Sequence, residues 1–201
     1  MEKLSKKIVD WLIRTENVRE EKRNIYEYGV RQLIMYLCDL IGIVMIGIYE
    51  NALMETLVIA LLFMLLQRYA GSYHAPARWI CYVGSMVLIT VSVKGYLLLQ
   101  NSKINILILT VLAGGIVLLS PVENRNKPLD KMEKTIYKGR CFWVCFLYVL
   151  ISVAAQKIRI NIVSDFVLIT FLDIMILQSI GRISMYNKTN SQHLKPNSQH
   201  R

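Results

Sequence analysis

Long apolar runs alternate with short polar segments along most of the chain, and charged residues are rare inside the runs. A helix needs about 20 mostly apolar residues to cross the hydrocarbon core of a bilayer. Runs near that length predict transmembrane or re-entrant helices at residues 32–49, 52–66, 79–99, 104–119, 141–155 and 162–183. The second and fifth runs are shorter than a bilayer core, so they extend into their flanks, tilt or re-enter.

The first 23 residues have a different pattern, in which charged and apolar residues alternate. There is no continuous apolar core of the kind that a cleavable signal peptide has, so none is predicted. On a helix one face would carry Leu4, Ile8, Trp11, Leu12 and Val18, flanked by lysines and arginines. Such a helix either lies in the headgroup layer or packs on the protein's own surface.

The pattern as a whole predicts an all-α integral membrane protein with one domain over residues 1–186. That domain comprises an amphipathic helix at 1–23 and a helical bundle at 24–186. Residues 187–201 are polar without apolar periodicity, and we expect a disordered tail there. Composition agrees, because 54% hydrophobic residues and a mean hydropathy of +0.39 are too apolar for an ordinary soluble domain of 201 residues.

Basic residues set the predicted orientation. The chain carries a net charge of +10, but its lysines and arginines flank the apolar runs, which disfavours a nucleic-acid-binding face. Eight of them precede the first run and six lie within 121–140, whereas the turn at Glu50 and Asn51 has none. By the positive-inside rule, both termini, the segment 67–78 and the segment 121–140 are cytoplasmic in a multi-pass protein of the cell membrane.

The segment "QRYAGSYHAPARWICYV" places a histidine and a cysteine at the rim of the membrane. A cysteine thiolate is a strong nucleophile, and a nearby histidine can take its proton and later protonate a leaving amine. On one straight helix His74 and Cys81 would be about 10 Å apart, which exceeds hydrogen-bond reach.

A catalytic pair therefore requires the chain to turn between the two residues, and Pro76 provides a break. Cys81 would then lie early in the next helix, where the amino end favours a thiolate. Gly71 and Ser72 permit a tight turn just before His74. The alternative is an ordinary connecting loop.

Other polar and sulfur-bearing residues favour less specific roles. Cys38, Cys141 and Cys145 are expected to fill space in the core, and neither a disulfide, a metal nor a cofactor is predicted. Ionisable residues within the runs leave open a small transporter or a non-catalytic membrane scaffold. These residues are Asp39, Glu55, Lys94 and Asp173, of which Glu55 and Lys94 are placed to pair.

A family resemblance adds to this interpretation. "RYAGSYHA" followed by "ARWIC", together with the later "SPVENRNKPL", resembles the AgrB-type (accessory gene regulator B) membrane peptidases of Gram-positive quorum sensing. The matching positions are Arg68, Gly71, His74, Ala75 and Cys81. Ser72 stands where the family pattern has a second glycine, which affects the local turn rather than the Cys/His pair.

The resemblance implies a thiol endopeptidase that processes a propeptide of the AgrD type, with an amphipathic leader and an acidic C-terminal tail. Cys81 would attack the carbonyl before the tail and form an acyl-enzyme, and His74 would be its base and then its acid. A thiol or hydroxyl of the propeptide would capture the acyl group and close a thiolactone or lactone ring. The resemblance also implies a homodimer.

Basic residues of the segment 121–140 suit an acidic tail, and the candidates are Arg125, Lys127, Lys131 and Lys134. Their other reading is topology-setting charge in contact with anionic lipid. Arg68, Gly71, Ser72 and Pro76 are the expected supporting residues of the site. Arg68 either orients a carboxylate or braces the turn.

The charge pattern generates a topology prediction. Reporter fusions after Glu50 and after Asn126 should report opposite sides of the membrane, because the basic-residue counts alternate between these loops. Enzymatic reporters active on one side only would measure this. The same side for both fusions would contradict the predicted orientation.

Overall fold

The structure is a computed structural model that describes residues 2–15, 19–71, 78–100, 104–122 and 130–193. Within these ranges the chain forms helices and no strand, which confirms the all-α prediction. The helices are α1 (Glu2–Arg14), the 3-10 turn η1 (Glu20–Lys22), α2 (Arg23–Tyr49), α3 (Leu53–Ala70), α4 (Arg78–Leu99), α5 (Ile106–Leu119), α6 (Lys131–Lys157) and α7 (Ile162–His193).

Five of these helices are long and apolar enough to cross a membrane, and α5, with 14 residues, is shorter. The second and fifth apolar runs, which are short, extend into their flanks, which was one of the expected alternatives. Helix α3 continues to Ala70, and α6 starts at Lys131, ten residues before the apolar run at 141. Hydropathy marks the part of a helix that suits lipid, whereas the helix itself continues through charged turns at the membrane surface. Helix α7 likewise extends to His193, past the expected start of the polar tail at 187.

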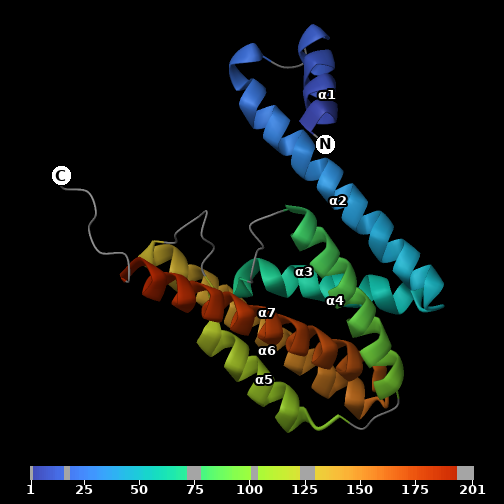
Figure 1. Cartoon of the computed structure of the whole chain (residues 1–201). Helices are drawn as coiled ribbons and strands as arrows, with labels where there is room; N and C mark the ends of the chain where they lie inside the picture. The colour runs from blue at the N-terminus through green and yellow to red at the C-terminus, as the bar shows by residue number, and fades with distance from the viewer. Residues whose placement is uncertain (1, 16–18, 72–77, 101–103, 123–129, 194–201) are drawn as a thin grey trace.

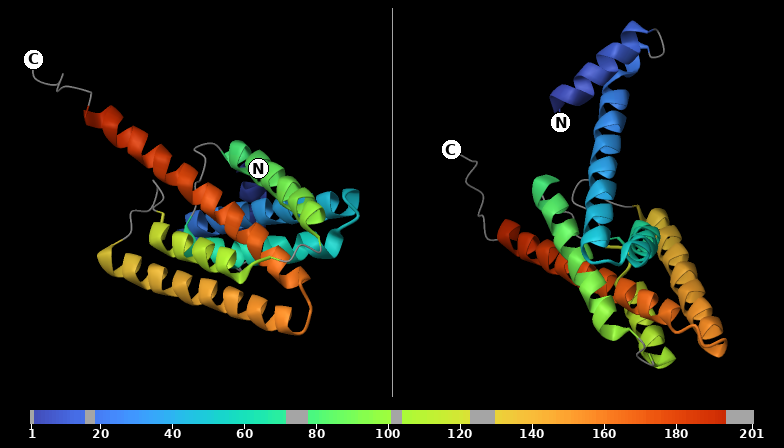
Figure 2. Two further views of the ribbon diagram at one scale, coloured as in Figure 1. Left: turned by 90° about the horizontal axis from the view of Figure 1, so that it is seen from below. Right: turned by 90° about the vertical axis from the view of Figure 1, so that its right-hand side faces the viewer.

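Helix α7 is the central element of the bundle. It contacts α3, α4, α5 and α6, and in Figure 2 it lies between α4 and the pair α5 and α6. In its most apolar stretch 56% of the residues are buried, against 6% in α2. Every helix of the bundle body is therefore arranged around α7.

Two groups of buried side chains hold the helices together. The larger lies between α3, α5, α6 and α7 and includes Leu66, Ala70, Leu109, Ile116, Cys141, Cys145 and Phe171. The smaller joins α2, α3, α4 and α7 and includes Ile59, Val93, Tyr96, Phe166 and Ile169. Small residues such as Ala70 and Cys141 recur at these contacts, because helices in lipid associate by close packing rather than by a hydrophobic driving force.

Helices α1 and α2 form an arm. Figure 1 shows α1 and the first half of α2 standing away from the other helices. Large apolar side chains are exposed along α2, and they include Leu33, Tyr36, Leu37, Leu40, Ile41 and Met45. Such a surface is costly in water but is satisfied by lipid tails.

A helix at the N-terminus is present and packs on α2, but it ends at Arg14 rather than at residue 23 as expected. Its most buried apolar side chain is Val9, whereas Leu4 and Trp11, from the face expected to be apolar, stay exposed. Arg23 of α2 bonds Asp10 of α1 and fixes the pair. The helix thus contacts its own protein while it still presents Trp11 to a headgroup layer.

The end of α3 lies directly against the segment that follows α5. The backbone N–H of Val122 donates to the carbonyl of Ala70 at 3.1 Å, and the Ser120 hydroxyl donates to the carbonyl of Tyr69 at 3.3 Å. Gly71 ends the helix with φ 71° and ψ 157°, a region that is essentially restricted to glycine. A Cβ atom there would overlap the Val122 carbonyl oxygen and lie 2.9 Å from the Val122 nitrogen.

Gly71→Ala should therefore lower the free energy of unfolding by about 2 kcal/mol or more, because it adds backbone strain to a steric overlap. Thermal unfolding of the purified protein in detergent measures the change. Gly114→Ala is the matched control, since a Cβ at Gly114 of α5 meets nothing within 4 Å. Equal stability of the two variants would contradict the tight junction at Gly71.

Candidate functional site

The described part of the histidine and cysteine motif lies at one end of the bundle. Gly71 closes α3, and Cys81 is the fourth residue of α4, which confirms that the cysteine comes early in a new helix. Cys81 is half-buried, and its carbonyl accepts a hydrogen bond from the Ser85 hydroxyl. His74, Ser72 and Pro76 lie outside the described residues.

The structure brings together the two motifs that the sequence presents 51 residues apart. Ser120 and Val122, from the second motif, bond the last turn of α3, from which the first motif continues. This contact connects a segment next to the basic loop with the start of the histidine segment. The sequence pattern contained both motifs but did not indicate that they touch.

Gln178, which the sequence pattern did not indicate, also bonds the end of α3. The side chain of Gln178 in α7 is fully buried, and its amide nitrogen donates to the carbonyl of Ala70 at 3.0 Å and to that of Ile116 at 3.4 Å. The last carbonyls of a helix have no partner within the helix. Gln178 thus provides a hydrogen-bond donor to the carbonyl of Ala70, which has no partner within α3, next to the first motif. The signal in the sequence was a polar amide within a long apolar run.

Basic residues surround this end. Arg68 is exposed on the last turn of α3, Lys131 is exposed at the start of α6 and Lys134 is half-buried one turn on. Arg125 and Lys127 fall outside the described residues. Arg140 of α6 lies 5.9 Å from the ring of Tyr69, so the first turns of α6 run beside the end of α3.

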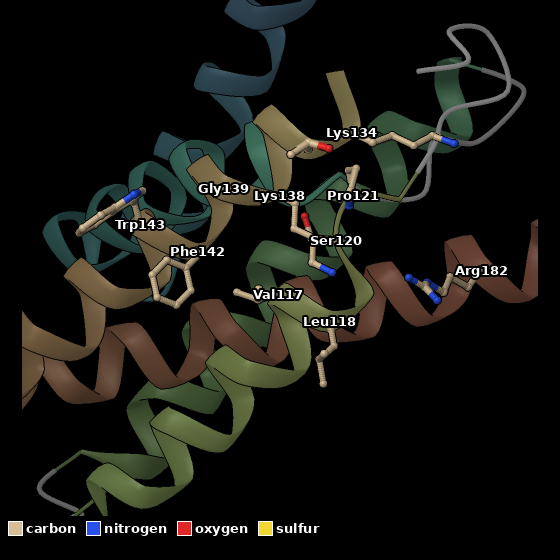
Figure 3. A pocket seen from close by; sticks show the side chains of 11 residues that line it. Val117, Leu118, Ser120, Pro121, Lys134, Lys138, Gly139, Phe142, Trp143 and Arg182 are labelled. Atoms are coloured by element: carbon tan, nitrogen blue, oxygen red, sulfur yellow. The ribbon is translucent and has the colours of Figure 1, made fainter. Parts of the chain in front are cut away.

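A hollow of about 740 Å³ opens between the end of α5, the first half of α6 and α7. Figure 3 shows the side chains of Lys138 and Arg182 directed toward it. Arg182 also donates to the carbonyl of Leu119 at 2.7 Å. The apolar part of the lining is formed by Val117, Leu118, Phe142 and Trp143. The sequence pattern did not indicate a role for Arg182.

Two of the ionisable residues within the helices, Asp173 and Lys94, have partners among the described residues. Asp173 of α7 accepts a hydrogen bond from the Ser92 hydroxyl of α4 at 2.7 Å. Lys94 pairs with Glu50 at 3.6 Å, so the expected pairing with Glu55 was wrong. Glu50 follows the last residue of α2, and the packing of α2 on α4 brings it to Lys94.

Two of the remaining cysteines fill space in the core as expected, whereas Cys38 lies outside it. Cys141 and Cys145 are buried in the larger core, and Cys38 is half-buried on α2. All of the chain's cysteines, including Cys81, are free thiols. Cys81 differs from the buried pair because it lies at a helix start next to the motif.

Comparisons with known proteins cover most of the chain. The family model for accessory gene regulator B matches residues 5–181. A putative AgrB-like protein of Clostridium perfringens strain SM101 is 26% identical over 177 residues, which cover 81% of this chain and 80% of that protein. The putative AgrB-like protein 2 of C. perfringens strain 13 is 25% identical over 80% of this chain and 79% of its own length.

The accessory gene regulator protein B of Staphylococcus aureus strain Newman is 32% identical over 105 residues, or 50% of this chain and 54% of that protein. No solved structure matches. The family match runs from within α1 to within α7 and includes both motifs. This chain is therefore a member of the accessory gene regulator B family.

Proposed function

We propose that this protein is a membrane thiol endopeptidase that cleaves a quorum-sensing propeptide and promotes its cyclisation. The observation that carries the proposal is the position of Cys81 in the first turn of α4, the helix that follows the junction between the end of α3 and Val122 in the sequence. The amino end of a helix favours an anion, which suits a nucleophilic thiolate. His74 precedes this helix in the sequence and is the proposed acid and base.

The first step is acyl transfer to the enzyme. His74 takes the proton of the Cys81 thiol, and the sulfur attacks the carbonyl carbon of the peptide bond before the acidic tail. The carbon–nitrogen bond then breaks, and His74 protonates the departing amine. The products are a thioester on Cys81 and the released tail peptide.

The second step closes the ring. A thiol or hydroxyl within the propeptide attacks the thioester carbonyl, gives its proton to His74 and displaces the Cys81 sulfur. The product is a cyclic thiolactone or lactone peptide, the autoinducing signal. Water must be kept from the thioester for this exchange to compete with hydrolysis, and a site at the membrane rim supports that exclusion.

Recognition of the acidic tail is assigned to Arg125, Lys127, Lys131 and Lys134. Lys131 and Lys134 lie in the first turn of α6. The following turns of α6 lie beside the end of α3, where the Arg140 guanidinium is 5.9 Å from the centre of the Tyr69 ring. Positive charge there attracts an acidic segment and holds the preceding peptide bond near Cys81. We place this site and both termini on the cytoplasmic side and propose that the protein acts as a homodimer.

A small transporter is the competing function, and the buried carboxylates Asp165 and Asp173 of α7 favour it. Asp173, however, has the Ser92 hydroxyl as a partner and thereby joins α7 to the helix that carries Cys81. Loss of function through Asp173→Asn, with full function kept in Cys81→Ala, would favour transport over peptidase chemistry.

Cys81→Ala should abolish cleavage and the acyl-enzyme, because the nucleophile is gone, while the protein still folds in the membrane. His74→Ala should slow acylation by about 100- to 10,000-fold, the usual size of general acid–base catalysis. Incubation with a propeptide, followed by mass spectrometry of the hydroxylamine-labile thioester, measures both effects.

Cys38→Ala is the matched control, since Cys38 is also a half-buried thiol but lies on α2, and it should keep full activity. A thioester on a cysteine other than Cys81, or complete cleavage by the Cys81→Ala protein, would contradict the mechanism.

Charge reversal at Lys127 and Lys131 should raise the KM for a propeptide with an acidic tail and leave kcat nearly unchanged, because binding rather than chemistry is affected. Added salt should weaken processing by the parent protein more than by the variant, since salt screens the attraction that the variant has lost. Lys157→Glu, at the other end of α6, is the control. Processing that is unchanged at all salt concentrations would assign these lysines to lipid contact instead.

A further inference from the structure

The hollow between α5, α6 and α7 combines positive charge with an apolar wall that faces outward. Lys138 and Arg182 turn toward it from α6 and α7, and Lys134 lies at its upper part (Figure 3). Leu118 is 74% exposed, Trp143 is 66% exposed and Phe142 is 50% exposed. In a helix bundle of this kind, such exposed apolar residues face the acyl chains of the bilayer.

The charged and apolar residues of the hollow follow one another in depth. Lys134, Lys138 and Phe142 are spaced four residues apart on α6, so they share a face and are about 6 Å apart along the helix axis. Phe142 and Trp143 pack edge to face with centroids 6.0 Å apart. Two cationic side chains are thus followed along the helix by an aromatic cluster. This order matches one leaflet of a bilayer, in which the charged headgroups lie above the acyl chains.

Arg182 strengthens the charged end of this face. Its Nη2 donates to the carbonyl of Leu119, at the C-terminus of α5, which orients the guanidinium across the gap between α5 and α7. A guanidinium has five N–H donors in a planar fork that matches phosphate oxygens. Basic pockets between transmembrane helices are a known setting for anionic lipid headgroups.

We propose that this hollow binds one anionic phospholipid. Lys138 and Arg182 hold the headgroup phosphate, and one acyl chain lies on Phe142, Trp143 and Leu118. An acidic peptide would use the same cations, but the exposed aromatic wall opens toward the bilayer and fits an acyl chain. The site does not depend on the proposed peptidase function.

Occupancy would support the neighbouring motif. The lipid phosphate would sit beside Arg182, which bonds Leu119, and the next residue, Ser120, bonds the end of α3. A headgroup in this place therefore bridges α6 and α7 next to the junction that precedes the histidine segment. Anionic lipid is expected to act as a structural ligand of that junction.

Tryptophan quenching tests the proposal directly. Trp11 and Trp79 are replaced by phenylalanine, so that Trp143 is the sole tryptophan of the full-length protein. The protein is reconstituted in phosphatidylcholine with increasing amounts of dibrominated phosphatidylglycerol, and in matched vesicles with dibrominated phosphatidylcholine. Quenching of Trp143 should show a several-fold preference for phosphatidylglycerol.

Lys138→Gln should lower this preference about fivefold, the change expected for one basic residue at an anionic surface, and Lys138→Arg should restore it. Lys131→Gln is the matched control, because it removes the same charge from the same helix outside the hollow, and it should change little. Equal quenching by both lipids, or equal losses in Lys131→Gln and Lys138→Gln, would overturn the proposal. Displacement of phosphatidylglycerol by a soluble oligoglutamate peptide would also overturn it and assign the hollow to an acidic peptide.

Discussion

The carbonyl of Ala70 is the point on which the arrangement of the site depends. The last carbonyls of a helix have no partner within the helix, and because Ala70 is fully buried, solvent cannot supply the missing donor. Here the donors are the side chain of Gln178 on α7 and the backbone of Val122 after α5. Both donors bond the same oxygen atom, that of the Ala70 carbonyl. These bonds hold the end of α3, helix α7 and the second motif in one fixed arrangement.

Single hydrogen bonds between polar side chains also join other helices to α7. Ser92 and Asp173 join α4 to α7, and the amide of Gln156 on α6 bonds the carbonyl of Ile104 and the hydroxyl of Ser164. Each of these bonds is worth about 1 kcal/mol in a membrane, so close packing of small residues supplies most of the cohesion. The polar bonds select which faces meet.

The functional proposals concern two surfaces of one end of this bundle. The peptidase chemistry is assigned to Cys81 and His74, beyond the end of α3. The anionic lipid is assigned to the hollow at Lys138 and Arg182, on the side of α5 and α6. Residues 119–122 connect the two surfaces, because Leu119 accepts a hydrogen bond from Arg182 while Ser120 and Val122 bond the end of α3.

The sequence by itself determined the all-α class, the apolar helices, the amphipathic first helix and the early position of Cys81 in α4. These features follow from local periodicity and from one helix break, which need no knowledge of neighbours. The matching motifs also identified the family before any helix was placed.

The tertiary structure alone decided the helix lengths and the partners. The charged residues 131–140 belong to the same helix as the apolar run that follows them, and α5 is the short helix of the bundle. Helix ends depend on packing and capping as well as on hydropathy. Lys94 forms an ion pair with Glu50 rather than with Glu55. The Gln178 side chain donates a hydrogen bond to the carbonyl of Ala70, 108 residues away. Such contacts depend on which helices lie side by side, and hydrophobic periodicity does not specify a partner because any apolar face can meet any other.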